Sequence, residues 1–120
     1  MKIALSSKGN DLDNNMDLRF GRAEYFIIYN IENDEFQAIE NKGYTASGGA
    51  GIASAQQLIE KSIDVVISGN FGPNAYDLLK DSEIKMYKGE DIPIKELIQN
   101  YKLGKLEEIK SAGPSHKGGH

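Results

Sequence analysis

Short apolar segments alternate with polar ones through the first third of the chain, and their composition indicates β-strands. The apolar run over residues 2–6 predicts a short buried strand. Aromatic and β-branched residues over 23–30 predict the most clearly marked strand. Residues 32–35 are polar and predict a turn, after which residues 36–41 pair back as a third strand. We therefore expect an antiparallel hairpin near the N-terminus.

A helical repeat of apolar positions replaces the strand pattern in the middle of the chain. Ile52, Ala55 and Ile59 recur at helical spacing, with Leu58 beside them, and predict a helix over about 49–61. The same two patterns predict four later elements: a buried strand over 63–68, a helix over 73–80, a short strand over 83–87 and an amphipathic helix over 92–102.

The order of these elements gives the expected fold class. Strands that alternate with helices favour a parallel portion of sheet with helices on its faces. We therefore expect an α/β fold with a mixed sheet of about five strands and an N-terminal antiparallel hairpin. The length of 120 residues predicts one domain, placed at residues 1–103 because the apolar pattern fades after Leu103. Residues 104–120 are expected to be a flexible tail that contains glycine and histidine.

The composition excludes several classes of function. With 14 basic and 18 acidic side chains the net charge is −4, which argues against a nucleic-acid partner. The chain has no cysteine, so it forms no disulfide and offers no thiolate to a metal. The N-terminus lacks a signal peptide, and no run approaches the length of a membrane span, about 20 residues. We expect a cytoplasmic monomer or weak homodimer that does not contact a membrane.

Three loops carry the candidate chemistry. A long polar loop over 8–22 ends in L-R-F-G-R, a glycine-rich turn over 47–51 leads into the first predicted helix, and a third turn over 70–74 follows a parallel strand. Open α/β sheets bind ligands at the carboxyl ends of their parallel strands. The N-terminus of a helix presents unpaired N–H groups and the positive end of its dipole, and these favour an anion.

The expected guest is therefore an anion held by residues from all three loops. Ser47 is the predicted N-cap of the first helix, and Arg19 and Arg22 supply cationic donors. The alternatives are that the arginines pair with nearby carboxylates such as Asp17, and that the glycines form only a tight turn. The candidate binding residues are Arg19, Phe20, Gly21, Arg22, Ser47, Gly48, Gly49, Ala50, Gly51, Asn70, Phe71, Gly72 and Asn74.

Three motifs occur in a fixed order: F-G-R-A-x-Y-F over residues 20–26, G-G-A-G-I over 48–52 and D-V-V-I-S-G-x-F-G-P-N-A over 64–75. Together they resemble the dinitrogenase iron–molybdenum cofactor biosynthesis family, in particular its small domains similar to NifX, NafY and the C-terminal domain of NifB. The resemblance covers about residues 1–103 and implies a ribonuclease H-like fold with three α/β/α layers.

The same resemblance implies a function without catalysis. Family members bind or carry anionic metal–sulfur clusters or their precursors, and one related branch holds a molybdenum–copper sulfide cluster non-covalently. The implied guest is an iron–sulfur or molybdenum-containing sulfide cluster, and the implied partners are metal-cluster assembly proteins. Without cysteine, this chain is left with non-covalent capture by backbone N–H groups, Arg19 and Arg22, or with ligation by histidine. The histidines, His116 and His120 in the tail, are candidate metal ligands, although two imidazoles are too few for a closed site.

Other functions fit the pattern less well. A nuclease needs carboxylates that hold two metal ions, and the first predicted strand has none. Nucleophilic catalysis lacks a base, because no histidine precedes the tail. A nucleotide- or phosphate-binding regulatory module stays open, although the glycine-rich turn matches neither a P-loop nor the Rossmann spacing. A small protein-interaction module that uses the hairpin edge is the remaining alternative.

Overall fold

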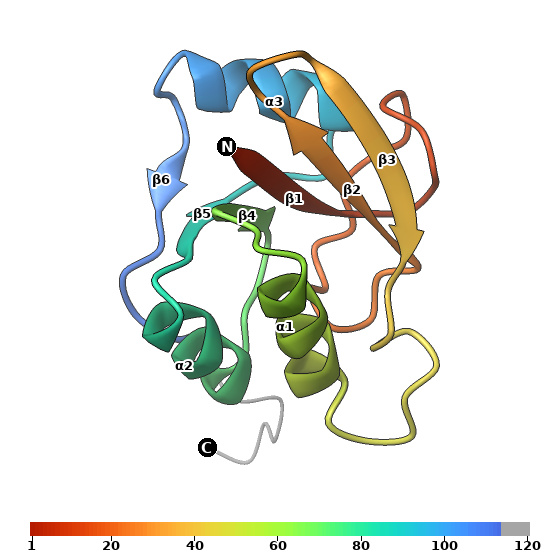
Figure 1. The fold of residues 1–120 in the computed structure, drawn as a ribbon, viewed down its shortest axis with the longest axis vertical. Coiled ribbons are helices and arrows are strands. Elements are labelled where there is room, and N and C mark those ends of the chain that lie inside the picture. Colours follow the sequence, from red (N-terminus) through yellow and green to blue (C-terminus); the bar gives the residue numbers. More distant parts are fainter. Residues whose placement is uncertain (114–120) are drawn as a thin grey trace.

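The computed structural model describes residues 1–113, which fold around one mixed β-sheet (Figure 1). The strands are β1 (Lys2–Ser7), β2 (Tyr25–Asn30), β3 (Glu35–Glu40), β4 (Val65–Ser68), β5 (Lys85–Lys88) and β6 (Glu107–Glu108). The helices are α1 (Ala50–Glu60), α2 (Pro73–Asp81) and α3 (Ile94–Lys102). Within residues 1–113, none of these helices is long and apolar enough to cross a membrane.

The strands follow one another across the sheet in the order β3-β2-β1-β4-β5-β6. The predicted hairpin is confirmed, because β2 and β3 pair antiparallel with Tyr25 opposite Glu40 and Asn30 opposite Glu35. Strand β1 pairs antiparallel with β2 and parallel with β4, and β4 pairs parallel with β5. The predicted parallel portion is therefore also present, and the carboxyl ends of its three strands lie at one edge of the sheet.

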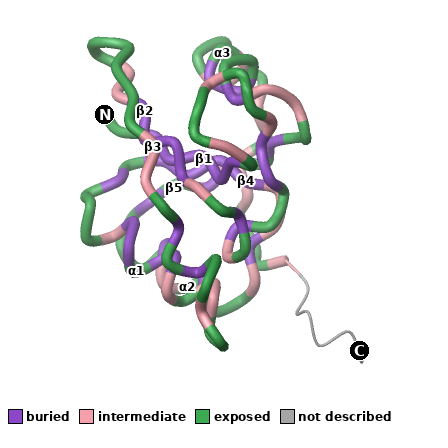
Figure 2. The backbone as a smooth tube through the Cα atoms, turned by 90° about the vertical axis from the view of Figure 1, so that its right-hand side faces the viewer, coloured by how far each residue is buried: buried purple, intermediate pink, exposed green. Residues whose placement is uncertain are grey.

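Helices cover both faces of the sheet, so the molecule has three layers. Helices α1 and α2 lie side by side over one face and α3 lies over the other (Figure 1). The first core joins buried side chains of α1 and α2, such as Leu58 and Leu79, to Phe26 and Val66 of the sheet. The second joins Leu97 of α3 and its neighbours to the opposite face. Figure 2 shows that burial is concentrated in the sheet and on the inner sides of the helices. The ribonuclease H-like label itself stays a prediction.

The expected number of about five strands is corrected by β6. This strand pairs antiparallel with β5, with Tyr87 opposite Glu108. Beyond it, the N–H of Ile109 donates to Met86 O at 2.7 Å, and the N–H of Gly113 donates to Phe71 O at 3.0 Å. The sequence could not indicate a strand of two residues, because alternation needs more positions than that. The segment up to residue 113 therefore packs on the domain, and His116 and His120 lie outside the described residues.

Candidate anion-binding site

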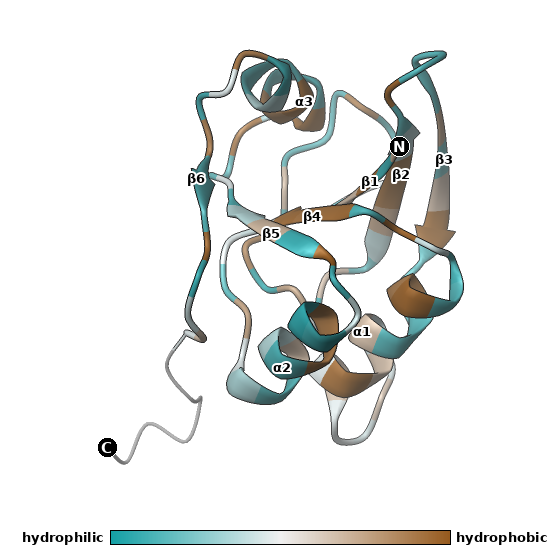
Figure 3. Cartoon of the chain, turned by 60° about the vertical axis from the view of Figure 1, so that its left-hand side comes forward, coloured by the Kyte–Doolittle hydropathy of each residue, from teal (hydrophilic) through white to brown (hydrophobic). Residues whose placement is uncertain are grey.

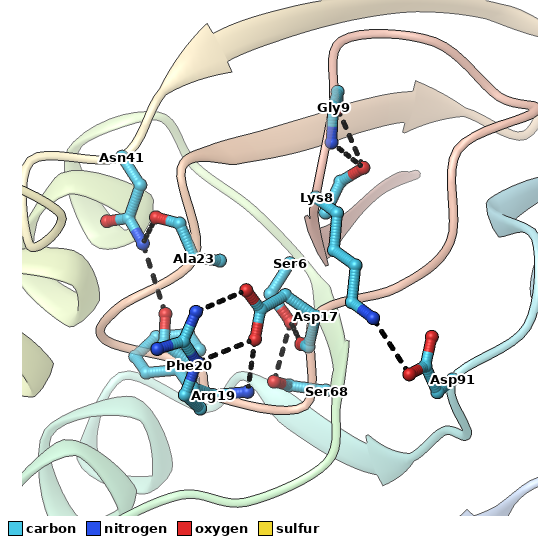
Figure 4. Close-up of polar contacts among 11 residues, drawn as sticks. Ser6, Lys8, Gly9, Asp17, Arg19, Phe20, Ala23, Asn41, Ser68 and Asp91 are labelled. Atoms are coloured by element: carbon cyan, nitrogen blue, oxygen red, sulfur yellow. Dashed lines mark hydrogen bonds and ion pairs between the residues drawn. The ribbon is translucent and has the colours of Figure 1, made fainter.

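The long loop over residues 8–22 is fastened across the carboxyl ends of β1 and β4. The hydroxyl of Ser6 donates to Asp17 O at 2.7 Å, and its oxygen lies 2.6 Å from the hydroxyl oxygen of Ser68 (Figure 4). The N–H of Asp17 donates to Ser6 O at 3.0 Å. Leu18 then lies directly over Gly69, where a Cβ would be 2.6 Å from the Leu18 Cδ2. These contacts bring the end of the loop to the predicted edge of the sheet.

Two phenylalanines hold this loop against the third loop. The rings of Phe20 and Phe71 lie 5.0 Å apart, and Phe20 also packs on Phe26 at 5.4 Å. Phe20 and Phe71 are 2% and 1% exposed. Both were candidate binding residues, and their side chains are instead part of the core that positions the loops.

Arg19 lies next to the third loop but is paired within the protein. It forms an isolated parallel β-bridge with Asn70. Its Nε and Nη2 donate to the two carboxylate oxygens of Asp17 at 3.1 and 2.9 Å (Figure 4). Asp17 is almost buried whereas the Arg19 side chain is two-thirds exposed. The geometry thus supports the alternative that Arg19 pairs with Asp17 inside the protein. This ion pair neutralises much of the charge of Arg19.

The Asp17 carboxylate is stabilised in its charged form by this pairing. Burial raises the pKa of Asp17, but hydrogen bonds from the Arg19 side chain and backbone and its positive charge outweigh that effect and hold the pKa below its ordinary value. Because the pKa is lowered in the folded state, the stabilisation is present above the unfolded pKa of about 3.9 and is lost as the pH falls through the folded value.

The substitution Asp17→Asn is therefore expected to lower the free energy of unfolding by about 1–2 kcal/mol at pH 7, and the difference from the parent should shrink as the pH falls through the lowered pKa of Asp17. Urea unfolding at pH 7, 5 and 3 measures it. Asp13→Asn is the matched control, because its ion pair with Lys95 is exposed and is worth less than about 1 kcal/mol. An equal loss at all three pH values would show that the Asp17 charge is not responsible.

Arg22 points to the loop before α1 and keeps its charge. Its Nη1 donates to Gly43 O at 3.2 Å and to Ala46 O at 2.8 Å. The Arg22 residue is exposed, and within residues 1–113 it has no carboxylate partner in an ion pair. Two neutral carbonyl groups orient a guanidinium without cancelling its charge, so Arg22 is the cation of this edge that remains available to an anion.

The N-termini of α1 and α2 lie at the same edge and carry no side-chain caps. The N-cap of α1 is Gly49, which has a left-handed backbone conformation with φ of 63°. The prediction that Ser47 caps this helix is therefore wrong. A left-handed N-cap suits glycine, which needs no Cβ there. The N-cap of α2 is Gly72, followed by Pro73 as predicted for the first turn. In both helices the first N–H groups therefore lack a side-chain acceptor.

The loop and the two helices touch through glycines. A Cβ on Gly21 would lie 2.8 Å from the backbone N of Gly51, so the first loop runs directly against the first turn of α1. A Cβ on Gly51 would lie 3.3 Å from the Ala75 Cβ, so the first turns of α1 and α2 are also in contact. The predicted meeting of three loops at one edge is thus observed, although no ligand role follows from it alone.

Asn41 organises this region and was not a candidate from the sequence. Its Nδ2 donates to Phe20 O at 3.1 Å and to Ala23 O at 2.9 Å (Figure 4). Its Oδ1 accepts from the N–H of Gly43 at 3.0 Å and from the Ser54 hydroxyl at 2.6 Å. Asn41 is 3% exposed. One buried amide thus joins the loop before β2, the loop before α1 and α1 itself. An asparagine after a strand looks like an ordinary turn residue, so no pattern in the sequence indicates this role.

The remaining candidates are spread around this arrangement. Ser47 and Gly48 are exposed, and a Cβ on Gly48 would meet nothing within 4 Å. Asn74 is exposed in the first turn of α2, and Asn70 is half-buried beside Gly113. Ile52, predicted for the apolar face of α1, is 36% exposed. Among residues 1–113, no three His, Cys, Asp or Glu side chains are grouped closely enough to hold a metal ion. Binding at the edge would therefore rely on hydrogen-bond donors such as backbone N–H groups and Arg22, and not on a cluster of metal ligands.

Comparison with known proteins places the whole domain in one family. Residues 1–104 match the family model described as dinitrogenase iron–molybdenum cofactor. An uncharacterised protein of Methanocaldococcus jannaschii is 37% identical over 113 residues, which cover 91% of this chain and 92% of the relative. The apo form of the orange protein from Desulfovibrio gigas is similar with a TM-score of 0.89 and 29% identity, covering 94% of this chain and 96% of that one.

A NifB-like protein from Thermotoga, which belongs to the DUF35 family, has a TM-score of 0.82 and 34% identity and covers 94% of this chain and 97% of its own. These sequence and structural similarities extend over the sheet, all three helices and the edge at which the loops meet. The chain therefore belongs to the dinitrogenase iron–molybdenum cofactor family.

Proposed function

We propose that this protein binds an anionic metal–sulfur cluster or cofactor precursor non-covalently at the edge formed by the three loops. The observation that carries the proposal is the contact of two helix N-termini, both without side-chain caps, beside Arg22. Each N-terminus is equivalent to roughly half a positive charge, and Arg22 adds a full one. This edge therefore favours an anion although the chain as a whole has a net charge of −4.

The donor set matches a sulfide-rich anion that is carried and not altered. Backbone N–H groups and a guanidinium donate hydrogen bonds to sulfur or oxygen and form no covalent bond with the metal. The chain has no cysteine that could replace a ligand of the cluster. A guest held in this way can be released intact, which is what a carrier in cofactor biosynthesis requires. The partners of such a carrier are the assembly proteins that supply and receive the cluster.

The test is an anaerobic titration with tetrathiomolybdate, followed by the charge-transfer absorption of the bound anion. Arg22→Gln is expected to weaken binding at least about tenfold, because it removes a charged donor worth about 1.5–3 kcal/mol. The matched control is the double variant Asp17→Asn, Arg19→Gln, which removes an internal ion pair without a change in net charge and is expected to shift the affinity less than about threefold.

Two outcomes would contradict the assignment. Uptake by the Arg22→Gln variant equal to that of the parent would reject the edge as the site. If a chain truncated after residue 113 loses uptake, the site would instead be assigned to His116 or His120. If ATP or inorganic phosphate raises the melting temperature and tetrathiomolybdate does not, the phosphate-binding function is correct, since the same N–H groups can donate hydrogen bonds to either anion.

A further inference from the structure

The outer edge of β3 is a feature that the anion site does not use. Strand β3 is the last strand of the sheet and pairs only with β2. Within residues 1–113 no strand pairs with its other side, and Figure 3 shows β3 along one flank of the molecule. An edge strand of six residues with free backbone groups is a template for pairing with another chain.

The register identifies which backbone groups point outward. The N–H of Asn41 donates to Glu24 O at 3.0 Å, so this pair is hydrogen-bonded to β2. Hydrogen-bonded and non-bonded pairs alternate along an antiparallel ladder. Ile39 and Gln37 therefore bond to β2, whereas Phe36, Ala38 and Glu40 direct their N–H and C=O groups away from it. The outward C=O of Glu40 already accepts a hydrogen bond from Gln57 Nε2 at 2.8 Å, so the free groups are those of Phe36 and Ala38 and the N–H of Glu40. Phe36 is also 40% exposed, so an apolar side chain borders these free groups.

The charge along this edge is of one sign. Residues 32–40 contain four carboxylates and no basic side chain. Glu32 pairs with the N-terminal amine and Asp34 pairs with Lys102. Within the described residues, Glu35 and Glu40, at the two ends of the strand, have no ion-pair partner. An approaching strand with acidic side chains is repelled by this edge, and one with basic side chains is attracted.

A hollow lies at the C-terminal end of β3, where Glu40 is part of its lining. It has a volume of about 420 Å³, and its lining includes Glu24, Glu40, Lys42, Tyr44 and Gln57. The acidic residues Glu24 and Glu40 and the basic Lys42 all contribute to this lining. The hollow is large enough for a lysine or arginine side chain. It adjoins Glu40, whose charge attracts a basic side chain.

From these observations we infer that β3 is the docking site for an extended segment of another protein, which adds a seventh strand to the sheet and places a lysine or arginine side chain beside Glu40, at the hollow that adjoins the end of the strand. The backbone of the segment bonds to the N–H and C=O groups of Phe36 and Ala38 and to the N–H of Glu40, and the basic side chain gives the contact its selectivity. A second copy of this chain fits less well, because it would bring the same carboxylates to the interface. The inference is independent of the anion site.

Amide hydrogen exchange on the full chain tests the inference. The probes are two synthetic peptides, Arg-Thr-Val-Thr-Val-Thr and Thr-Val-Thr-Val-Thr-Arg, which together allow for both strand directions, and the same peptides with Glu in place of Arg. At saturation, the matching arginine peptide is expected to slow exchange of the Phe36, Ala38 and Glu40 amides at least about tenfold. The amides of Gln37 and Ile39 serve as internal controls, because they already bond to β2.

Variants separate the backbone and charge contributions. Glu40→Gln is expected to weaken binding of the arginine peptide about fivefold, and Glu60→Gln, an exposed carboxylate on α1, is the control that leaves it unchanged. Ala38→Pro removes an outward N–H without removing a bond to β2, so the variant is expected to fold and to lose binding.

Three results would overturn the inference. The first is equal binding of the arginine and glutamate peptides. The second is equal protection of all amides of β3, which would indicate a general stabilisation and no added strand. The third is concentration-dependent protection without peptide, which would assign the edge to a second copy of the chain. A fall of the Ala38→Pro melting temperature by more than about 10 °C would leave the exchange pattern of the parent as the deciding measurement.

Discussion

Replacing Asn41 by aspartate is expected to lower the free energy of unfolding by about 3–5 kcal/mol at pH 7, a large part of the stability of a domain of this size. The change replaces a donor by a carboxylate oxygen that faces the carbonyl oxygens of Phe20 and Ala23 at 3.1 and 2.9 Å. An ionised carboxylate at this buried position has no positive partner and is repelled by both carbonyls. The loops that form the anion site are joined at this residue, so tetrathiomolybdate uptake is expected to fall with stability.

The pH dependence of this loss identifies its cause. Burial and the two carbonyls raise the pKa of the introduced aspartate in the folded state. The variant should therefore be close to Asn41→Ala near pH 4, where the carboxyl is protonated, and should become less stable by up to about 1.4 kcal/mol per pH unit as the pH rises. Urea unfolding between pH 4 and pH 8 measures this. Gln56→Ala, an exposed amide on α1, is the control and should change stability by less than about 0.5 kcal/mol. A pH-independent difference would argue against the buried charge.

Replacing Gly43 by alanine is expected to lower the free energy of unfolding by about 3 kcal/mol or more. A Cβ on this residue would lie 2.6 Å from Ala50 O and even closer to Gly21 O and the Ser54 hydroxyl. Two of these three atoms belong to the backbone and cannot move without a displacement of the first loop from α1. Gly43 also provides one of the carbonyls that orient Arg22, so the change should weaken uptake of the anion as well.

Two neighbouring glycines are matched controls for this prediction. A Cβ on Gly48 meets nothing within 4 Å, so Gly48→Ala is expected to be neutral or to stabilise by a few tenths of a kcal/mol. A Cβ on Gly49 would also meet nothing within 4 Å, but the backbone φ of Gly49 is 63°. Gly49→Ala should therefore lower stability by about 1 kcal/mol through backbone strain alone. Thermal and urea unfolding rank the three variants. A Gly43→Ala protein as stable as Gly48→Ala would show that the loop moves away from α1 easily, and the close contact at this edge would then have no structural importance.

Much of the fold could be predicted from local patterns. The hairpin, the three helices and the parallel strands appear close to their predicted ranges, because each has enough residues for its apolar period to be recognised. The predictions failed where a segment was too short to show an apolar period, or where the apolar or capping pattern did not decide which residue is buried or caps the helix. Strand β6 has only two residues, and Ile52 has helical spacing but lies on the exposed first turn of α1. Ser47 has the side chain of an N-cap, but the left-handed Gly49 closer to the helix takes that position.

The sequence alone determined the types and order of the long elements, the family and the three loops that meet at the carboxyl edge of the sheet. The tertiary structure decided which polar groups in those loops remain available. It pairs Arg19 with Asp17, leaves Arg22 on two carbonyls and makes Asn41 the link between three segments. The physical reason is range. A helix or strand depends on side chains a few positions apart, whereas the carbonyls that orient Arg22 and the Ser54 hydroxyl that bonds to Asn41 lie 13 to 24 residues away along the chain and reach hydrogen-bond distance only after folding. Asp17 is only two residues from Arg19, and the sequence offered it as one of several partners; burial of Asp17 in the folded protein selects this pair.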